Sequence, residues 1–343
     1  MLKNKILGCI VGGAVGDALG YPIEFHSYNN IVSYFGKNGV SDYVFDKGLI
    51  SDDTQMTLFT IEALLKENNG KYPFEEIEYY KRNIYESYKN WYLTQTSPFS
   101  KRKVSDIDVY DEDSILLNTE GMFDLRAPGN TCLSSLKSGK MGSIRNPIND
   151  SKGCGGVMRV APIGLYFRPF VYNSHFVATL AGEVSAITHG HLLGNIPSSM
   201  LATMLYKICH EDCSLHQSIE ESLKVVEEVY GNSYEWSKFK KIIRDAILLS
   251  NSQNSDIENI EILGGGWVAE ETLAIAIYSV LRYSDDFEKA VVASVNHSGD
   301  SDSTGAVTGN IMGALLGYDK IPKRYVENLE MKDLIEEMAL KLV

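Results

Sequence analysis

Hydrophobic residues recur along most of this chain at spacings of three and four residues, the period that places them on one face of an α-helix. Stretches of alternating hydrophobic and polar residues long enough for a β-sheet are scarce. The pattern therefore predicts an all-α fold, a compact multi-helix single domain that spans residues 1–343. The predicted helical segments are 3–20, 52–66, 74–92, 158–167, 174–190, 197–209, 215–230, 235–250, 268–282, 286–296, 304–316 and 330–342.

The first of these helices and the one at 304–316 carry glycine at every fourth position, so that the glycines share one face. Glycine in a helix interior costs about 1 kcal/mol relative to alanine, which close approach of a neighbouring helix can offset. We expect both ends of the chain to lie in the middle of one core. That arrangement would bring Asp17 and Glu24 near Asp300 and Asp302. The glycines are Gly8, Gly12, Gly16 and Gly20 near the start, and Gly305, Gly309, Gly313 and Gly317 near the end.

Three polar, glycine-rich stretches separate the predicted helices, at 21–51, 94–156 and 251–267. The middle one is too long for a simple connection, which indicates a functional segment or an insertion. Its acidic run at 105–113 is interpreted as a solvated loop.

The composition excludes several classes of protein. The net charge of −13 disfavours nucleic-acid binding, which draws on clustered Lys and Arg. The five cysteines are odd in number and lie mostly in apolar stretches, so we expect no disulfide framework. Asp17 interrupts the apolar N-terminus, which argues against a signal peptide. No run reaches the roughly 20 apolar residues that span a bilayer, so we expect a cytoplasmic chain without membrane contact.

Two acidic clusters stand at predicted helix starts. Carboxylate and hydroxyl oxygens without His or Cys suit hard cations such as Mg²⁺ or Mn²⁺, and two such clusters facing each other would suit a pair of ions. Helix capping is the alternative, since acidic residues are favourable in a first helical turn. An EF-hand is excluded, because the twelfth position counted from Asp300 is Ile311 rather than an acid. The clusters comprise Ser51, Asp52 and Asp53, and Asp300, Asp302 and Ser303.

Seven segments in this order resemble the ADP-ribosylglycohydrolase family, which includes the dinitrogenase-reductase-activating glycohydrolases. They are GCIVGGAVGDALGYPIEF (8–25), SDDTQMTL (51–58), APGNTC (127–132), GCGGVMRVAPIGL (153–165), THGH (188–191), GGGWVAEETLAIA (264–276) and HSGDSDSTGAVTGNIMGALLG (297–317). The resemblance implies an all-α fold with a central cleft that holds two divalent cations, Mg²⁺ or Mn²⁺. It assigns as metal ligands Ser51, Asp52, Asp53, Asp300, Asp302 and Ser303. The family usually has threonine at the two serine positions, and serine keeps the hydroxyl.

The resemblance also implies a reaction. The cations hold the hydroxyls of the distal ribose, a carboxylate-activated water attacks the anomeric carbon, and ADP-ribose leaves the modified side chain. Glu24 and Asp53 are the candidate catalytic acids. The expected substrate is an ADP-ribosylated protein, with arginine as the acceptor, acted on by a monomeric enzyme. The alternatives are O-linked or small-molecule conjugates of ADP-ribose, such as O-acetyl-ADP-ribose, ADP-ribosyl-serine or modified nucleic-acid ends, and a non-catalytic ADP-ribose binder.

Further residues are candidates for substrate binding. The glycine-rich turn at 153–156 suits close approach of backbone N–H groups to a diphosphate. Cys209, His210, Cys213 and His216 are crowded into eight residues, unlike the two separated ligand pairs of a zinc module, so a zinc site there is disfavoured. His297 is expected to orient the acidic loop. The candidate substrate-binding residues are Asn130, Thr131, Gly153, Cys154, Gly155, Gly156, His189 and Trp267.

Overall fold

The computed structural model describes residues 1–66, 76–102 and 113–343, and these residues confirm the all-α prediction. They form sixteen α-helices, and their only β-type pairings are two isolated bridges. The helices are α1 (Leu2–Gly20), α2 (Tyr28–Phe35), α3 (Asp52–Leu64), α4 (Glu76–Thr96), α5 (Asn130–Lys137), α6 (Ala161–Tyr166), α7 (Ser174–Ala186), α8 (Leu192–His210), α9 (Leu215–Tyr230), α10 (Tyr234–Leu249), α11 (Asp256–Leu263), α12 (Ala269–Arg282), α13 (Phe287–Val295), α14 (Ser301–Leu316), α15 (Lys323–Glu327) and α16 (Lys332–Leu340).

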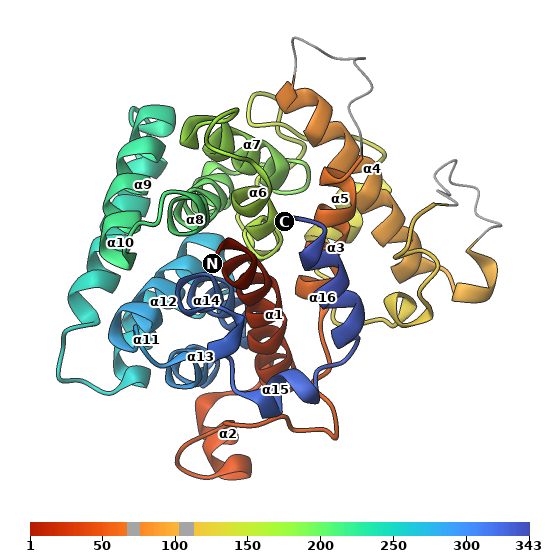
Figure 1. Ribbon diagram of the computed structural model, residues 1–343. Coiled ribbons are helices and arrows are strands. Elements are labelled where there is room, and N and C mark those ends of the chain that lie inside the picture. Colours follow the sequence, from red (N-terminus) through yellow and green to blue (C-terminus); the bar gives the residue numbers. More distant parts are fainter. Residues whose placement is uncertain (67–75, 103–112) are drawn as a thin grey trace.

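Helices α1 and α14 cross near the centre of the molecule, with other helices packed around them (Figure 1). They run antiparallel, and their glycines meet back to back. A Cβ added at Gly12 would lie 2.5 Å from the carbonyl oxygen of Gly309, and one added at Gly16 would lie 2.0 Å from that of Gly305. The two helices can approach this closely only because no side chain stands between them. The predicted glycine packing is confirmed at these positions.

The glycine contact determines which ends of the two helices meet. Gly20, the last residue of α1, packs against the backbone of Ser301 in the first turn of α14. Glu24 follows α1 after one short 3₁₀ turn, and Asp300 and Asp302 flank Ser301. The acids from both ends of the chain are therefore brought together by the glycine-lined crossing of α1 and α14.

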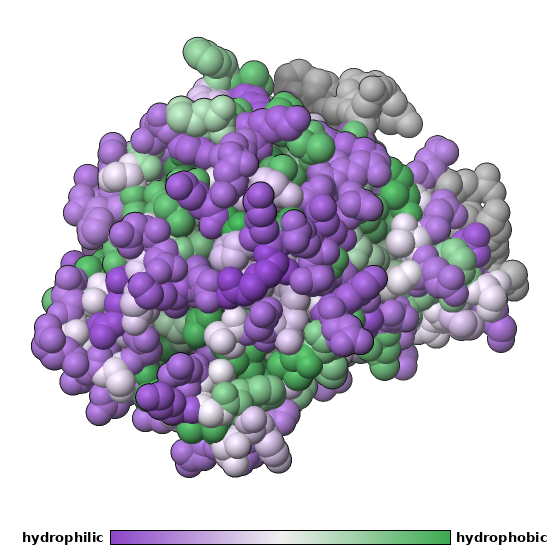
Figure 2. Space-filling view, turned by 60° about the horizontal axis from the view of Figure 1, so that its bottom comes forward, coloured by the Kyte–Doolittle hydropathy of each residue, from purple (hydrophilic) through white to green (hydrophobic). Residues whose placement is uncertain are grey.

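The helical stretch Leu2–Ile23, formed by α1 and the 3₁₀ turn after it, is by length and composition apolar enough to cross a membrane, with a mean hydropathy of 1.5, contrary to the sequence expectation. In the structure 83% of that apolar window is buried within the protein. A core helix passes the same test of length and composition, and burial against α14 accounts for the apolar sequence. Figure 2 shows a predominantly hydrophilic face, with a smaller group of hydrophobic residues toward its lower edge.

Several boundaries differ from the predicted ones. Helix α7 ends at Ala186 rather than residue 190, and α8 begins at Leu192, five residues before Pro197. Pro197 lies inside α8, beyond the first turn, so its missing N–H removes one hydrogen bond of the helix. The segment between α7 and α8 is the THGH loop. Residues 74–75 of one predicted helix, and the acidic run at 105–113 except Asp113, lie outside the described residues.

Candidate metal and substrate site

The first acidic cluster forms the start of α3. Ser51 is its N-cap, and the Ser51 hydroxyl accepts a hydrogen bond from the backbone N–H of Asp53 at 3.2 Å. Asp17 of α1 accepts bonds from the backbone N–H groups of Ser51, at 3.0 Å, and of Thr54, at 3.2 Å. It also accepts one from the Thr54 hydroxyl. Asp17 thus anchors the helix start and leaves the carboxylates of Asp52 and Asp53 to face the cavity. This anchoring role was not predicted.

The second cluster forms the start of α14, three residues earlier than predicted. The Asp300 side chain caps the helix by accepting from the backbone N–H of Ser303 at 3.2 Å, and Asp302 accepts from the same group at 2.9 Å. His297 contacts the hydroxyl of Thr304 at 3.0 Å, and that hydroxyl donates to the carbonyl of Asp300 at 2.8 Å. This arrangement fits the expectation that His297 orients the acidic loop.

Both clusters line one cavity of about 180 Å³. Carboxylate oxygens of Glu24, Asp300 and Asp302 lie within 4.8 Å of one another. Thirteen of the fifteen predicted site residues line this cavity, and the two that do not are Ser51 and Gly156. Ser51 is buried as the cap of α3, and a Cβ at Gly156 would meet the Ser185 hydroxyl at 2.2 Å, so this glycine packs against α7 rather than facing the cavity.

The carboxylates of this site lack a basic counter-charge within the part of the chain that the structure describes. Among the described residues no Lys, Arg or His forms an ion pair with any of them, although Lys152 and Arg126 pair with other acids. Oδ2 of Asp53 and Oε2 of Glu24 are buried and have no hydrogen-bond partner. Buried carboxylates normally require a counter-charge, and these oxygen donors suit a hard divalent cation. The carboxylates concerned are Asp17, Glu24, Asp52, Asp53, Asp300 and Asp302.

Burial, reinforced by mutual repulsion, raises the pKa values of these groups. Loss of solvation and then repulsion by Asp300, Asp52 and Asp17 raise the pKa of Glu24 to about 9. Burial raises the pKa of Asp52 to about 8 and that of Asp17 to about 6. The pKa values of Asp53 and Asp302 also lie well above the usual range, for the same reasons.

The metal-free protein is therefore expected to lose stability as the pH rises from about 4, near the ordinary pKa of these carboxyl groups, to about 9. A carboxyl group whose pKa is raised by folding stabilises the native state fully while both states are protonated. This contribution disappears as the pH passes the folded-state pKa. Thermal unfolding of chelator-treated protein across this range should show a falling Tm, and added Mg²⁺ or Mn²⁺ should restore stability most at the alkaline end. A Tm of the metal-free protein that is flat or rises with pH would contradict the burial of these groups as unpaired acids.

A loop that contains the predicted APGN motif covers Asp52. The backbone N–H of Asp52 donates to the carbonyl of Arg126 at 3.1 Å, and the N–H of Gly129 donates to Oδ2 of Asp52 at 3.1 Å. Ala127 between them has a φ of 51°, a conformation that is costly for a residue with a side chain. These contacts hold Asn130 and Thr131 at the cavity wall, at the start of α5.

The glycine-rich turn and the THGH loop form the opposite wall. A Cβ at Gly155 would lie 3.0 Å from both the Cys132 sulfur and the His189 ring, so both side chains would have to shift to admit it. His189 is buried, its Nδ1 lies 2.9 Å from the Thr188 hydroxyl, and burial lowers its pKa to about 3. A neutral His189 can hydrogen-bond to a ligand but supplies no positive charge.

Trp267 stands at the rim of the cavity. The turn before it is fixed, because the Glu271 carboxylate accepts from the N–H groups of Gly265 and Gly266 at 3.1 and 3.2 Å. The Trp267 ring stacks on Phe25, with ring centroids 5.7 Å apart and planes 23° apart. Phe25 is 74% exposed and Trp267 is 44% exposed. Phe25 was not predicted, although its position next to Glu24 in the sequence was a usable signal.

Comparisons with known proteins agree with this geometry. The sequence model of the ADP-ribosylglycohydrolase family matches residues 1–343. The chain is 25% identical to ADP-ribosylarginine hydrolase Tri1 of Serratia proteamaculans, over 99% of this chain and 79% of that protein. It is 23% identical to ADP-ribosyl-[dinitrogen reductase] glycohydrolase of Rhodospirillum rubrum, over 96% and 92%. It is also 23% identical to mouse ADP-ribosylhydrolase ARH3, over 99% and 91%.

The fold is similar to that of a solved structure described as an ADP-ribosylglycohydrolase-related protein complex. The TM-score is 0.59 at 22% identity, and the match covers 99% of this chain and 97% of the other.

Proposed function

The chain belongs to the ADP-ribosylglycohydrolase family, and from this premise we propose that it removes ADP-ribose from modified arginine side chains of a protein by hydrolysing the N-glycosidic bond. The observation that carries the proposal is the group of buried carboxylates that have no basic partner among the described residues, since hydrolases of this family depend on metal ions. The choice of arginine is supported by the similarity to Tri1, whose name states that acceptor.

The residues of this chain would have distinct roles in binding the cations and in activating water. Two divalent cations, Mg²⁺ or Mn²⁺, would supply polarisation and orientation of substrate oxygens when bound. Asp52, Asp53, Asp300 and Asp302 would hold them, with the hydroxyls of Ser51 and Ser303. Glu24 and Asp53 each have an unpartnered oxygen in the cavity, so either carboxylate can hold the attacking water and accept its proton.

The remaining walls of the cavity would bind the ADP-ribose. Asn130, Thr131 and the neutral His189 offer hydrogen bonds to hydroxyl or phosphate oxygens. The backbone of Gly153, Cys154 and Gly155 lines the same cavity, which suits a diphosphate. The enzyme would accelerate hydrolysis by positioning water against the anomeric carbon and by stabilising the positive charge that develops there.

The proposal is tested by incubating the protein with ADP-ribose linked to arginine, to serine and to a nucleic-acid end, each with Mg²⁺, Mn²⁺ or chelator. We expect release of free ADP-ribose from the arginine conjugate, dependent on the cation. Preferential cleavage of serine or small-molecule conjugates would mean that the protein is an ADP-ribosyl hydrolase but that arginine is not its acceptor. Release that persists in chelator would reject the metal-dependent mechanism.

The stacked rings of Phe25 and Trp267 are proposed to contact the arginine acceptor. A guanidinium group over an aromatic face gains about 1–2 kcal/mol when partly desolvated, so Trp267→Ala should raise KM for the arginine conjugate roughly tenfold, with little change in kcat. Trp267→Phe, which keeps a ring, should recover most of the affinity. The prediction is tested by measuring kcat and KM of each variant on arginine and serine conjugates. An equal loss on both substrates would mean that the ring contacts ADP-ribose rather than the acceptor.

A further inference from the structure

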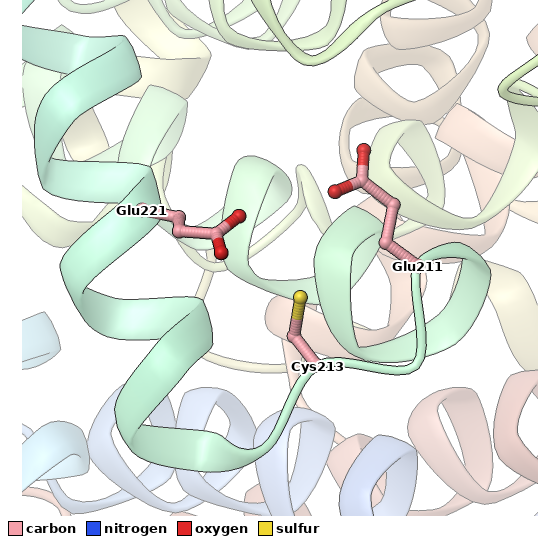
Figure 3. A group of neighbouring side chains, drawn as sticks. All are labelled: Glu211, Cys213 and Glu221. Carbon is pink, nitrogen blue, oxygen red and sulfur yellow. The ribbon is translucent and has the colours of Figure 1, made fainter.

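A group of carboxylates and sulfur outside the cavity already contains its own counter-charge. Glu211, Cys213 and Glu221 lie near the end of α8 and the start of α9, and their side chains face a common space (Figure 3). Lys207 donates to both acids, at 3.0 and 2.8 Å. The disfavoured zinc site fails as well, because His210 contacts a carbonyl oxygen of α6 at 2.9 Å instead. This group therefore needs no ion.

A row of aromatic side chains continues from the rim of the cavity onto α2. Phe25 stacks on Trp267 at the rim, and the next residue, His26, meets the ring of Tyr34 edge-on with centroids 6.1 Å apart. Tyr34 in turn meets the ring of Phe35 at 6.4 Å. Tyr34 is 71% exposed and Phe35 is 39% exposed, and both lie outside the lining of the cavity. These five side chains form what we call the aromatic row.

Helix α2 is held in a fixed position by the acidic loop, although it projects from the body of the molecule at the bottom of Figure 1. The backbone N–H of Tyr28 donates to the Ser298 hydroxyl at 2.8 Å. Just beyond the helix, the N–H of Val40 donates to the amide oxygen of Asn296 at 2.7 Å. Ile31 is fully buried and anchors the inner face of the helix. The outer face is therefore rigidly placed beside the cavity.

The exposure of the aromatic row indicates an interaction surface. The sequence of α2, YNNIVSYF, carries no charge, and its two outer rings are left in solvent. Contiguous exposed apolar groups on a protein surface mark binding sites more often than isolated ones do. Phe170, in the turn between α6 and α7, is fully exposed but lies outside the row, so it serves as a comparison.

The position of the row identifies its occupant. When a modified arginine of a protein enters the cavity, the residues before and after it must lie on the surface around the mouth. Phe25 and Trp267 stand at this mouth, and the row extends from them along α2. A helix of eight residues is about 12 Å long, which matches three to four residues of extended polypeptide, at about 3.3 Å per residue.

We propose that the aromatic row is a docking surface for the polypeptide next to the modified arginine, and that it selects apolar side chains within about four residues of that arginine. The inference rests on the proposed function and adds recognition of the protein that carries the modification. Uncharged aromatic rings gain most by covering apolar groups of a partner. Free ADP-ribosyl-arginine fills the cavity without reaching α2, so it lacks this contribution.

The test compares three substrates on the full-length protein with Mn²⁺. They are free ADP-ribosyl-arginine, a peptide with leucine and valine around an ADP-ribosylated arginine, and the same peptide with glycine and serine instead. In the wild type we expect the KM of the apolar peptide to be roughly tenfold below the other two, with a similar kcat. Tyr34→Ala should remove most of this advantage and leave the KM of the free conjugate unchanged.

Two further variants control this comparison. Tyr34→Phe keeps the ring and should keep the preference for the apolar peptide. Phe170→Ala removes an exposed ring outside the row and should change no KM value. Because Tyr34 is largely exposed, Tyr34→Ala should fold normally, and its unchanged activity on the free conjugate checks this directly.

The outcomes separate docking from hydrolysis. Equal KM values for the three substrates in the wild type, or an equal loss on all three in Tyr34→Ala, would overturn the docking surface and leave the proposed function intact. If serine conjugates are hydrolysed and arginine conjugates are not, the acceptor is wrong, and the same comparison on serine-linked peptides decides about docking. Absence of hydrolysis of every conjugate would overturn both.

A second copy of the chain is the competing occupant of the row. Sedimentation of the wild type and of Tyr34→Ala measures this directly. Self-association that is lost in Tyr34→Ala, with no change in the KM of the apolar peptide, would overturn substrate docking and assign the row to a dimer contact. We expect the same oligomeric state for both proteins.

Discussion

Replacing Asp302 with asparagine is expected to lower kcat by on the order of a thousandfold, because a bound cation supplies several kcal/mol of transition-state stabilisation and each ~1.4 kcal/mol is a factor of ten. The same substitution should raise the Tm of the metal-free protein. Burial, and then repulsion from Asp300, Asp53 and Glu24, raise the pKa of Asp302 well above the usual range. Asparagine removes this repulsion, so activity and stability should change in opposite directions.

Activity and stability measured together decide whether Asp302 is a metal ligand or only a helix cap. If the acids of α14 served only to complement the helix dipole, asparagine at position 302 would weaken the helix slightly and leave hydrolysis unchanged. Asp333, an exposed acid in the first turn of α16, provides the matched control. Asp333→Asn should change neither kcat nor the stabilisation by Mn²⁺. Both variants and the wild type are compared by hydrolysis assays and by thermal unfolding with and without Mn²⁺. If metal-free Asp302→Asn protein is less stable than the wild type, Asp302 acts as a helix cap rather than as a metal ligand.

The sequence predicted the long helices well and most of the short ones poorly, although the short helix α6 lies within the predicted segment 158–167. Helices α1, α9, α12 and α14 bury regular apolar or glycine faces, and such periodicity can be read directly from the residues. The short helices α2, α5, α11 and α15 lay in stretches interpreted as irregular or were not predicted. A helix of five to eight residues offers barely two turns in which a period can repeat, and its stability comes from packing that the sequence does not display.

The site was predicted to a similar extent, for a similar reason. Acids at helix starts are visible as local motifs, so Asp52, Asp53, Asp300 and Asp302 could be found, and the glycine faces indicated that the two motifs meet. Contacts between segments far apart in the chain carry no such local signal. The anchoring of Ser51 by Asp17, the stacking of Phe25 on Trp267 and the approach of the Cys154 sulfur to Asp300 all depend on the finished fold.

The crossing of α1 and α14 also allows the strongest test of how the fold creates the site. In an isolated helix, glycine to alanine is favourable by about 1 kcal/mol. In this protein Gly309→Ala should instead be destabilising by about 3 kcal/mol, because the new methyl would lie 2.0 Å from the backbone oxygen of Gly12 and overpacking of this kind is costly. Backbone atoms on both helices cannot move aside as a side chain could, so the helices must separate.

Separation of the helices should also weaken the metal centre, although Gly309 lies more than a helical turn from Ser303 and touches none of the candidate ligands. We expect a lower Mn²⁺ affinity in calorimetry together with the lower free energy of unfolding in urea. Gly121→Ala is the control, since its methyl would meet only the flexible thioether of Met331 at 3.1 Å, and both quantities should stay close to the wild type. A destabilised Gly309→Ala protein that binds Mn²⁺ with unchanged affinity would mean that the acids are held in place by their own loops. Joint loss of stability and affinity would instead identify the glycine crossing as the element that aligns Glu24 with Asp300 and Asp302.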